Sequence, residues 1–225
     1  MTTDYLLAYT EKLIRSRRAI RSFRPDPVPE ETLRAVFTLA AAAPSSSNTQ
    51  PWQVEVVSGA ARNRLSEDLL AAHAQQRRSP DFLLQDGLYS GIYQERRSAL
   101  GAAMYQALGI GREDVEARSK FAAEKSQVLR RATRRTALHA AHCGGTNFCG
   151  YRHLRADAST RAEYGIGSCP QGILGAYANT IRESLGIKDR KILLGISFGY
   201  TNPTAPLNNL PASRAELGET TRFHS

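Results

Sequence analysis

The sequence predicts a single α+β domain, from its length and from two kinds of apolar spacing. With 225 residues and 41% hydrophobic content, the chain is long enough to bury one core. After Pro29, a run of apolar residues has helical spacing, and it begins with two glutamates suited to the positive end of a helix dipole. Its members are Leu33, Val36, Phe37 and Ala40. In residues 53–57, Val54 and Val56 alternate as they would on one face of a strand.

Two further segments have the spacing of helices. Near the N-terminus, Leu6, Tyr9 and Leu13 predict a helix with a buried stripe. A second set predicts a core helix that ends at Gly186, a natural C-cap. Its apolar positions are Ile173, Leu174, Tyr177, Ile181 and Leu185.

A polar stretch with two prolines, residues 43–52 (APSSSNTQPW), lies between the predicted helix and strand. It brings hydroxyl, amide and backbone donors to one place, which is typical of a site for a planar polar ligand. The alternative is an ordinary connection whose Ser and Asn side chains cap nearby backbone groups.

Three arginines follow the first helix within residues 16–23 (SRRAIRSF): Arg17, Arg18 and Arg21. A guanidinium presents a rigid fork of donors that matches phosphate oxygens, so the cluster predicts a phosphate-binding element. The alternative is a solvated basic patch.

In this order, the two segments resemble the FMN-dependent nitroreductase family, in particular its nitrobenzoate-reductase-like branch. Members combine an Arg-Arg/His-Ser-x-Arg/Lys-x-Phe element with a Pro-Ser-Ser-x-Asn-x-Gln-Pro-Trp loop. Supporting segments are 93–116, 163–172, 191–200 and LPASR at 210–214. The loop positions that match are Pro44, Ser45, Ser46, Asn48, Gln50, Pro51 and Trp52.

The resemblance implies one FMN-binding domain over 1–225, with a nitroreductase-like fold in which helices flank a small mixed sheet. It also implies an intertwined homodimer. Residues 202–225 contain three prolines and little periodicity, and they would be the tail that wraps around the partner subunit.

The same resemblance divides an FMN site among several segments. The arginines would reach the phosphate and ribityl chain, the loop would cover the isoalloxazine ring from the other subunit, and residues 170–172 would lie along the reactive edge. Ala19 and Ala212 depart from the pattern, since Ser and Lys are common there. The implied cofactor-binding residues are Arg17, Arg18, Arg21, Pro44, Ser45, Ser46, Asn48, Pro170, Gln171, Gly172 and Arg214.

The implied activity is that of an oxidoreductase. NADH or NADPH would reduce the flavin, and a nitroaromatic or quinone would then take two electrons at the same place, in a ping-pong cycle. No catalytic acid or base is predicted, because the flavin carries the redox chemistry. The resemblance does not distinguish NADH from NADPH.

Composition indicates the cellular compartment. The chain has no apolar stretch of 18 residues and no signal-peptide core, so we expect a cytoplasmic protein without a membrane partner. Its three cysteines give no disulfide framework.

Residues 126–161 depart from the family pattern. With seven arginines and one acid, Asp157, they carry a formal charge of +6 out of +9, and no helical or strand period runs through them. A family member should have a central strand and a dimer helix here. A reading-frame slip is one hypothesis: the same shift, applied to back-translated 128–137 and 149–159, gives family-like Phe-Phe-Gly-Ala-Pro-His-Ala-Ala-Leu and Ala-Asp-Ile-Gly-Ile-Tyr-Ala-Gln-Thr-Leu. Its corollary is an inactive, frame-damaged member.

The same segment suggests two alternatives. One is a basic arm for nucleic acid, whose arginines would pair with phosphates. The other is a zinc site, but the ligand spacing matches no standard finger and the surrounding arginines would repel the ion. The prediction is therefore no metal, and a basic nucleic-acid-binding protein stays the alternative to the flavin enzyme. The possible zinc ligands are His139, His142, Cys143, Cys149 and His153.

Overall fold

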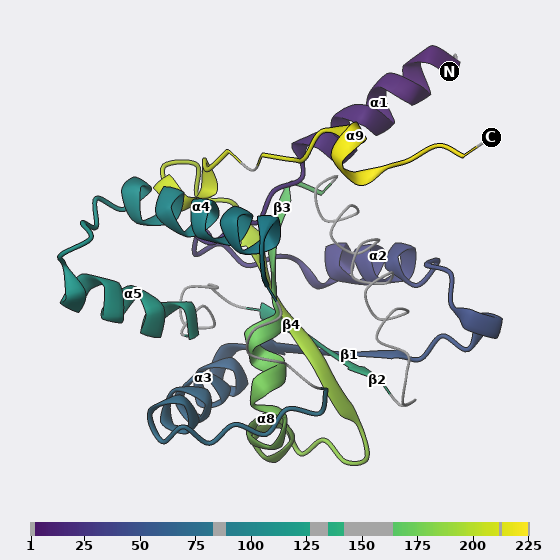
Figure 1. The fold of residues 1–225 in the computed structure, drawn as a ribbon. Coiled ribbons are helices and arrows are strands. Elements are labelled where there is room, and N and C mark those ends of the chain that lie inside the picture. Colours follow the sequence, from purple (N-terminus) through teal and green to yellow (C-terminus); the bar gives the residue numbers. More distant parts are fainter. Residues whose placement is uncertain (1–2, 83–88, 127–134, 142–163, 212, 225) are drawn as a thin grey trace.

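The computed structural model describes the chain apart from residues 1–2, 83–88, 127–134, 142–163, 212 and 225 (Figure 1). The described helices surround one sheet, so the α+β prediction is confirmed. The helices are α1 (Thr3–Ser16), α2 (Glu30–Ala40), η1 (Ser46–Asn48), α3 (Gly59–Ala74), α4 (Ile92–Ala107), α5 (Val115–Ser126), η2 (Gly172–Ala176), α8 (Ala178–Leu185), η3 (Pro206–Asn208) and α9 (Leu217–Thr220). The strands are β1 (Trp52–Ser58), β2 (Arg135–Ala141), β3 (Ile166–Gln171) and β4 (Lys191–Tyr200).

The four described strands form a sheet in the order β1-β2-β4-β3, and each neighbouring pair is antiparallel. The expected mixed sheet is therefore wrong for these strands. Long helical connections leave strand direction open, so spacing along the chain did not determine it. Parallel pairing is limited, among the described residues, to the isolated bridges Ala19–Ser168 and Ser79–Tyr177.

Strand β2 corrects the expectation that 126–161 contains no strand. It lies between β1 and β4 and pairs with both, with Thr136 opposite Val57 and Ser197. Backbone donors and acceptors hold a strand that is paired on both sides, so it does not need an alternating side-chain pattern. The flanking residues 127–134 and 142–163 lie outside the described part of the chain.

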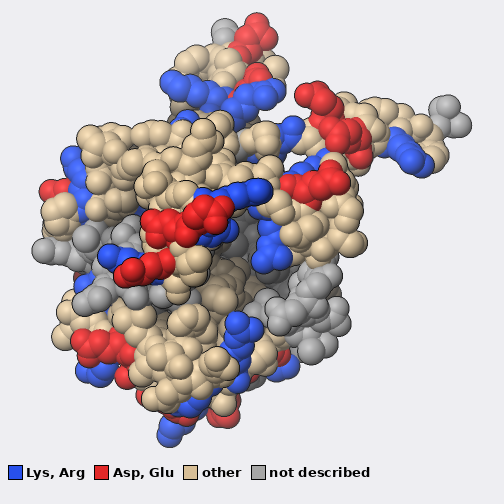
Figure 2. All heavy atoms as spheres, turned by 60° about the vertical axis from the view of Figure 1, so that its left-hand side comes forward, with Lys and Arg blue, Asp and Glu red and all other residues tan. Residues whose placement is uncertain are grey.

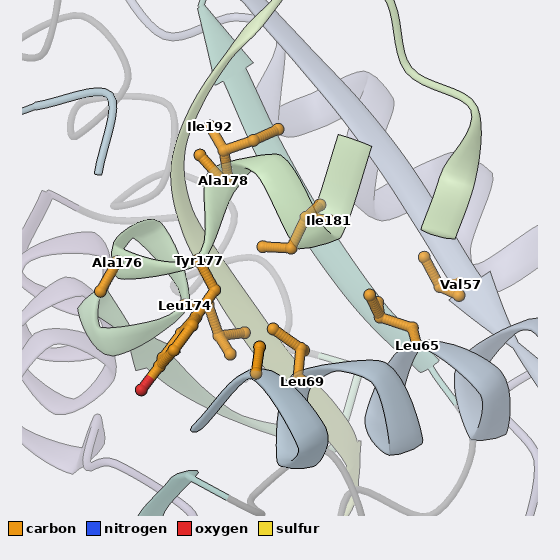
Figure 3. Close-up of a cluster of buried hydrophobic side chains, with 10 residues drawn as sticks. Val57, Leu65, Leu69, Leu174, Ala176, Tyr177, Ala178, Ile181 and Ile192 are labelled. Carbon is orange, nitrogen blue, oxygen red and sulfur yellow. The ribbon is translucent and has the colours of Figure 1, made fainter. Parts of the chain in front are cut away.

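Two groups of helices cover the sheet at different places. Helices α3 and α8 pack together, and Figure 3 shows Leu65 and Leu69 of α3 pointing toward Ile181. Val57 lies beside Leu65, and Ile192 lies next to Ala178. Helix α2 packs through Leu33 and Val36 with Phe198. Strand β4 has a bulge at Leu193, because Ile192 pairs with Ala140 and Leu194 pairs with His139. The extra residue places Ile192 on the opposite face from Phe198, so the two belong to different clusters despite their even spacing.

Helix α1 and the end of the chain project together from the body (Figure 1). The stripe predicted to be buried on α1 is not buried within this chain, because Leu6 and Tyr9 are exposed and Leu13 is half-buried. The helix itself is present as predicted. The second predicted core helix is split into η2 and α8, and Ile173 is exposed.

Candidate functional site

The arginine-bearing segment 17–23 lies along the end of the sheet. The Ile20 N–H donates to the Ser168 carbonyl at 2.9 Å, and the Arg24 N–H donates to the Tyr200 carbonyl at 2.8 Å. Gly167 makes this close approach possible, since a Cβ there would lie 2.7 Å from Ile20 Cγ1 and 2.6 Å from Thr201 Oγ1. The path of the segment is therefore set by β3 and β4.

Three of the four predicted arginines line one cavity. Arg17, Arg18 and Arg214 border a space of about 710 Å³ between α1 and the tail. A second hollow of about 350 Å³ lies against Arg17 and Arg18 on the side of β3, and Gly167 and Asn208 also line it. The structure thus brings the start of the arginine segment and the LPASR motif together, although they are almost 200 residues apart.

Arg21 lies apart from that cavity. Its Nη1 donates to the Ala19 carbonyl at 3.2 Å. Burial raises the pKa of the neighbouring Cys169 thiol, and the positive charge of Arg21 acts in the opposite direction. Arg21 is therefore close to Cys169 of β3 and is not among the residues that line the cavity. Cys169 is a buried, protonated thiol at neutral pH.

The predicted reactive edge, residues 170–172, lies at the end of β3 where η2 begins. Gln171 is buried, and its Oε1 accepts a hydrogen bond from Ser197 Oγ at 2.9 Å. Pro170 and Gly172 are exposed on either side of it. A buried side chain thus fixes the backbone between two exposed residues.

Two bonds within the loop 43–52 hold Ser45, Asn48 and Gln50 relative to one another. Ser45 Oγ accepts from the Gln50 N–H at 2.9 Å, and Gln50 Nε2 donates to the Asn48 carbonyl at 3.2 Å. Ser47, Asn48 and Gln50 all have positive φ, at 49°, 54° and 44°. These residues are exposed, so the conformation presents polar groups outward at some backbone cost.

The loop and the arginines do not meet within one subunit. Figure 1 shows the blue segment that follows α2 at the outer edge of the molecule, away from β3 and from the C-terminal end of α1. Trp52 begins β1, and Pro51 beside it is buried. Within a single chain, the arginine segment and the loop are therefore two separate groups of polar residues.

A third cavity, of about 660 Å³, lies between α4 and the tail. Tyr89, Tyr93 and Arg97 line it from one side, and Arg214 lines it from the other. Arg96 forms an ion pair with Glu219 at 2.8 Å, which ties α9 to α4. Arg214 borders this cavity and the first one, so an aromatic-lined pocket adjoins the arginine cavity.

The donor set fits a flavin nucleotide. Guanidinium groups from two segments border the first cavity, and planar forks of this kind bind phosphate oxygens in pairs. Of the two departures from the family motif, Ala19 is half-buried and pairs through its backbone with Ser168, while Ala212 lies outside the described residues.

Most of the residues on which the two alternative sites depend lie outside the described part of the chain. No group of three potential metal ligands occurs among the described residues, and four of the five possible zinc ligands, His142, Cys143, Cys149 and His153, fall outside them. On the face in Figure 2, basic and acidic side chains are interspersed. No helix in the described ranges is long and apolar enough to cross a membrane.

Comparison with known proteins gives consistent matches. The model of the Nitroreductase family matches residues 14–144. The nitroreductase NfnB of Mycolicibacterium smegmatis is 48% identical over 215 residues, which are 95% of this chain and 92% of that protein. A 4-nitrobenzoate reductase of Pseudomonas putida is a more distant relative, 27% identical over 215 residues, covering 95% of this chain and 94% of the other.

A solved structure gives the same answer for the fold. It is the FMN-dependent nitroreductase NfnB from Mycobacterium smegmatis in complex with NADPH, with a TM-score of 0.91 and 46% identity. The match covers 98% of this chain and all of that one, at 100%.

Proposed function

The chain belongs to the nitroreductase family, and we propose that it is an FMN-dependent nitroreductase that takes electrons from NADPH or NADH. The observation that carries the proposal is the cavity bordered by Arg17, Arg18 and Arg214. These guanidiniums would bind the FMN phosphate. When bound, FMN would supply the redox chemistry, accepting hydride from the nicotinamide and delivering two electrons to the acceptor.

The remaining site residues would position the ring. Pro170 and Gly172 are exposed beside the buried Gln171, so the backbone at the end of β3 can face the flavin while Ser197 holds it still. Arg21 lies against this strand and would place positive charge near the reduced ring, where an anion develops. Nitroaromatics or quinones are the proposed acceptors. No side chain is proposed as a catalytic acid or base at residues 170–172, because the flavin would carry the redox chemistry.

The active form in this proposal is a homodimer. Helix α1 has no buried residues in the single chain, and it exposes Tyr5, Leu6, Leu7 and Ile14. In the tail, Leu217 is 63% exposed and Phe223 is 85% exposed. Apolar surface of this extent on projecting elements is typical of an interface.

A second open surface supports the same proposal. A groove of about 720 Å³ runs between α2 and β1 and is lined by Phe37, Val54 and Val56. The loop 43–52 follows α2 and lies far from the arginines of its own chain. A second copy would cover the apolar surface and bring its loop to the first copy's arginines. The tail 202–225 is bonded to its own chain at Asn208 and Glu219, and it would also wrap around that copy through the exposed Leu217 and Phe223.

Flavin absorbance of the purified protein tests the cofactor. We expect a yellow dimer whose absorbance near the flavin maximum bleaches on addition of NADPH or NADH and recovers with a nitroaromatic. A colourless protein that does not take up added FMN would refute the proposal. Sedimentation measures the dimer independently of the flavin.

Mixed dimers test whether the site is shared. One subunit carries Arg17→Ala with Arg214→Ala, and the other carries Ser45→Ala with Asn48→Ala. If each site combines arginines from one chain with a loop from the other, the co-expressed heterodimer has one undamaged site and binds about half the wild-type FMN. Each homodimeric variant is the matched control. A heterodimer no better than the controls would place both halves in one subunit.

A reading-frame slip within 126–161 is a separate hypothesis. It is supported by the concentrated charge and by a family match that stops at residue 144, inside the segment. Strand β2, as written, nevertheless takes a central place in the sheet. Sequencing of a fresh template, with the intact mass, tests it. An uninterrupted frame with matching mass would remove the hypothesis and the inactive-member alternative that depends on it.

A further inference from the structure

A buried asparagine connects the two segments that supply arginines to the cavity. Asn208 ends η3 and is 2% exposed. Its Oδ1 accepts from the N–H of Arg21 at 2.7 Å and from the N–H of Ser22 at 3.1 Å. Its Nδ2 donates to the carbonyls of Ser22 at 2.7 Å and Asn202 at 2.8 Å.

These four bonds use the whole capacity of the amide. An Asn side chain offers two acceptor sites on oxygen and two donors on nitrogen, and all four are occupied by main-chain groups of Arg21, Ser22 and Asn202. If the amide were turned over, its NH2 group would face the two N–H donors and its oxygen would face the two carbonyls. The four partners therefore fix the orientation of the amide. No other side chain of similar size provides this combination.

The bonds occur where the sheet leaves the arginine segment unsupported. Ile20 pairs with Ser168 and Arg24 pairs with Tyr200, so the backbone is held at both ends by β3 and β4. Between those anchors, the N–H groups of Arg21 and Ser22 are bonded to Asn208 instead. Together with the Asn202 N–H, which donates to the Ser22 carbonyl at 3.1 Å, Asn208 thus sets the path of the chain between the anchors.

Asn208 is also close in sequence to the other arginine. Arg214 follows it by six positions, and Leu210 and Pro211 between them line the same cavity as Arg17 and Arg18. Asn208 therefore fixes the start of the tail relative to the arginine segment. Phosphate recognition depends on the distance between guanidiniums, and that distance depends on this connection.

We propose that Asn208 is a positioning residue for the flavin phosphate, which holds Arg17 and Arg18 in register with Arg214. The inference rests on the proposed FMN function. It assigns Asn208 no contact with the cofactor. Asn208 bonds only the main chain of Arg21, whose guanidinium is separately bonded to the Ala19 carbonyl. Asn208 should therefore govern how tightly FMN binds at its phosphate end and not how fast the loaded enzyme turns over.

The experiment compares Asn208→Ala, Asn208→Asp and the control Asn209→Ala in the full-length dimer. Asn209 is the exposed neighbour, and its Nδ2 donates only to the Pro203 carbonyl, at 3.0 Å, among the bonds of its side chain in the described structure. Asn208→Asp keeps both acceptor bonds to Arg21 and Ser22 and loses both donor bonds. The readouts are FMN dissociation constant, kcat at saturating FMN, and hydrogen exchange of individual amides.

In Asn208→Ala, we expect an FMN dissociation constant raised by roughly tenfold or more, with kcat at saturating FMN within about twofold of wild type. Exchange should accelerate at the amides of Arg21 and Ser22 while amides of β4 keep their protection. Asn208→Asp should also weaken FMN binding, because one of its carboxylate oxygens would face the carbonyls of Ser22 and Asn202. Asn209→Ala should resemble wild type.

Unchanged FMN affinity in Asn208→Ala, or acceleration spread equally over β4, would overturn the inference and leave Asn208 as a structural residue. If Asn208→Ala does not fold, Asn208→Asp decides by the same two measurements. Failure of the wild-type protein to bind FMN is a different result, because it removes the proposed function as well.

Discussion

The arginine segment 17–23 and the loop 43–52 supply the two halves of the proposed flavin site, and they are held in opposite ways. The arginine segment is bonded to β3, β4 and the buried Asn208 of its own chain. The loop has bonds of its own, through Ser45 and Gln50, and it has three exposed residues with positive φ angles. The arginine half is fixed to the sheet of its own chain, whereas the loop half uses local bonds and, in the proposed dimer, contacts with the partner.

This difference implies that the two halves of the proposed site contribute in different ways. A segment fixed by the sheet can present charge with little loss of entropy on binding, which favours affinity for the phosphate. A self-supported loop can adjust to a second subunit before it covers the ring. The four predictions that follow act on one half at a time, and the expected effect decreases from one to the next.

Arg17→Ala combined with Arg214→Ala should weaken FMN binding the most. Each lost charge-assisted hydrogen bond costs about 1.5–3 kcal/mol, so the pair should raise the dissociation constant by about a hundredfold or more. Flavin fluorescence titration measures it. Arg112→Ala, an exposed arginine between α4 and α5, is the matched control and should bind FMN normally. Retention of FMN by the double variant would show that the phosphate lies elsewhere.

Gly167→Ala should disturb the arginine half through its support. The new Cβ would lie under 3 Å from Ile20 and Thr201, and overpacking of this kind costs about 1–3 kcal/mol. We expect a lower urea midpoint and weaker FMN binding together. In contrast, Gly111→Ala has open space around its new Cβ and should change neither. Normal FMN affinity in Gly167→Ala would mean that the segment does not depend on this contact.

Ser45→Ala should affect the loop half with little effect on folding. The variant removes the acceptor for the Gln50 N–H, a bond worth about 1 kcal/mol at an exposed site. FMN affinity should fall by about fivefold or less, while the urea midpoint of the chain stays constant. Ser47→Gly is the counterpart, since glycine accepts φ of 49° without strain and should keep full affinity. Equal losses in both variants would contradict the importance of the Ser45 bond.

Cys169 should give the smallest effect. Burial raises the thiol pKa, so its contribution to stability is complete below the unfolded-state pKa and is lost as the pH rises through the folded-state value. We expect Cys169→Ala to bind FMN like wild type and to lose less stability between neutral and alkaline pH. Peptide mapping after treatment with a thiol reagent at pH 7 should find native Cys169 unmodified. Rapid modification would show that β3 opens beside the arginine segment.

Local patterns in the sequence predicted the elements nearest the site. Helix α2 begins at Glu30 and strand β1 covers 52–58, close to the predicted positions, because helical and alternating spacing are short-range signals. Arg17 and Arg214 line the same cavity. Only the resemblance to the family suggested that these distant segments act together, because spacing along the chain does not connect them.

Long-range packing explains what the sequence could not predict. The backbone partners of Asn208 at Arg21 and Ser22 are 187 and 186 residues away, and no local pattern marks an asparagine in a proline-rich tail as buried. Strand β2 is held by neighbours on both sides, so its irregular side-chain pattern gave no signal. An apolar stripe such as that on α1 predicts a surface that packs against another element. It does not indicate whether that element belongs to the same chain or to another one.

Strand β3 is an outer strand of the described sheet, and the arginine segment lies against it at Ser168. An uncovered outer strand offers free backbone groups to other chains and promotes aggregation. The segment that would bind the phosphate thus also shields this edge. Variants that loosen it should become more prone to self-association, and added FMN should keep them in solution by holding the segment in place.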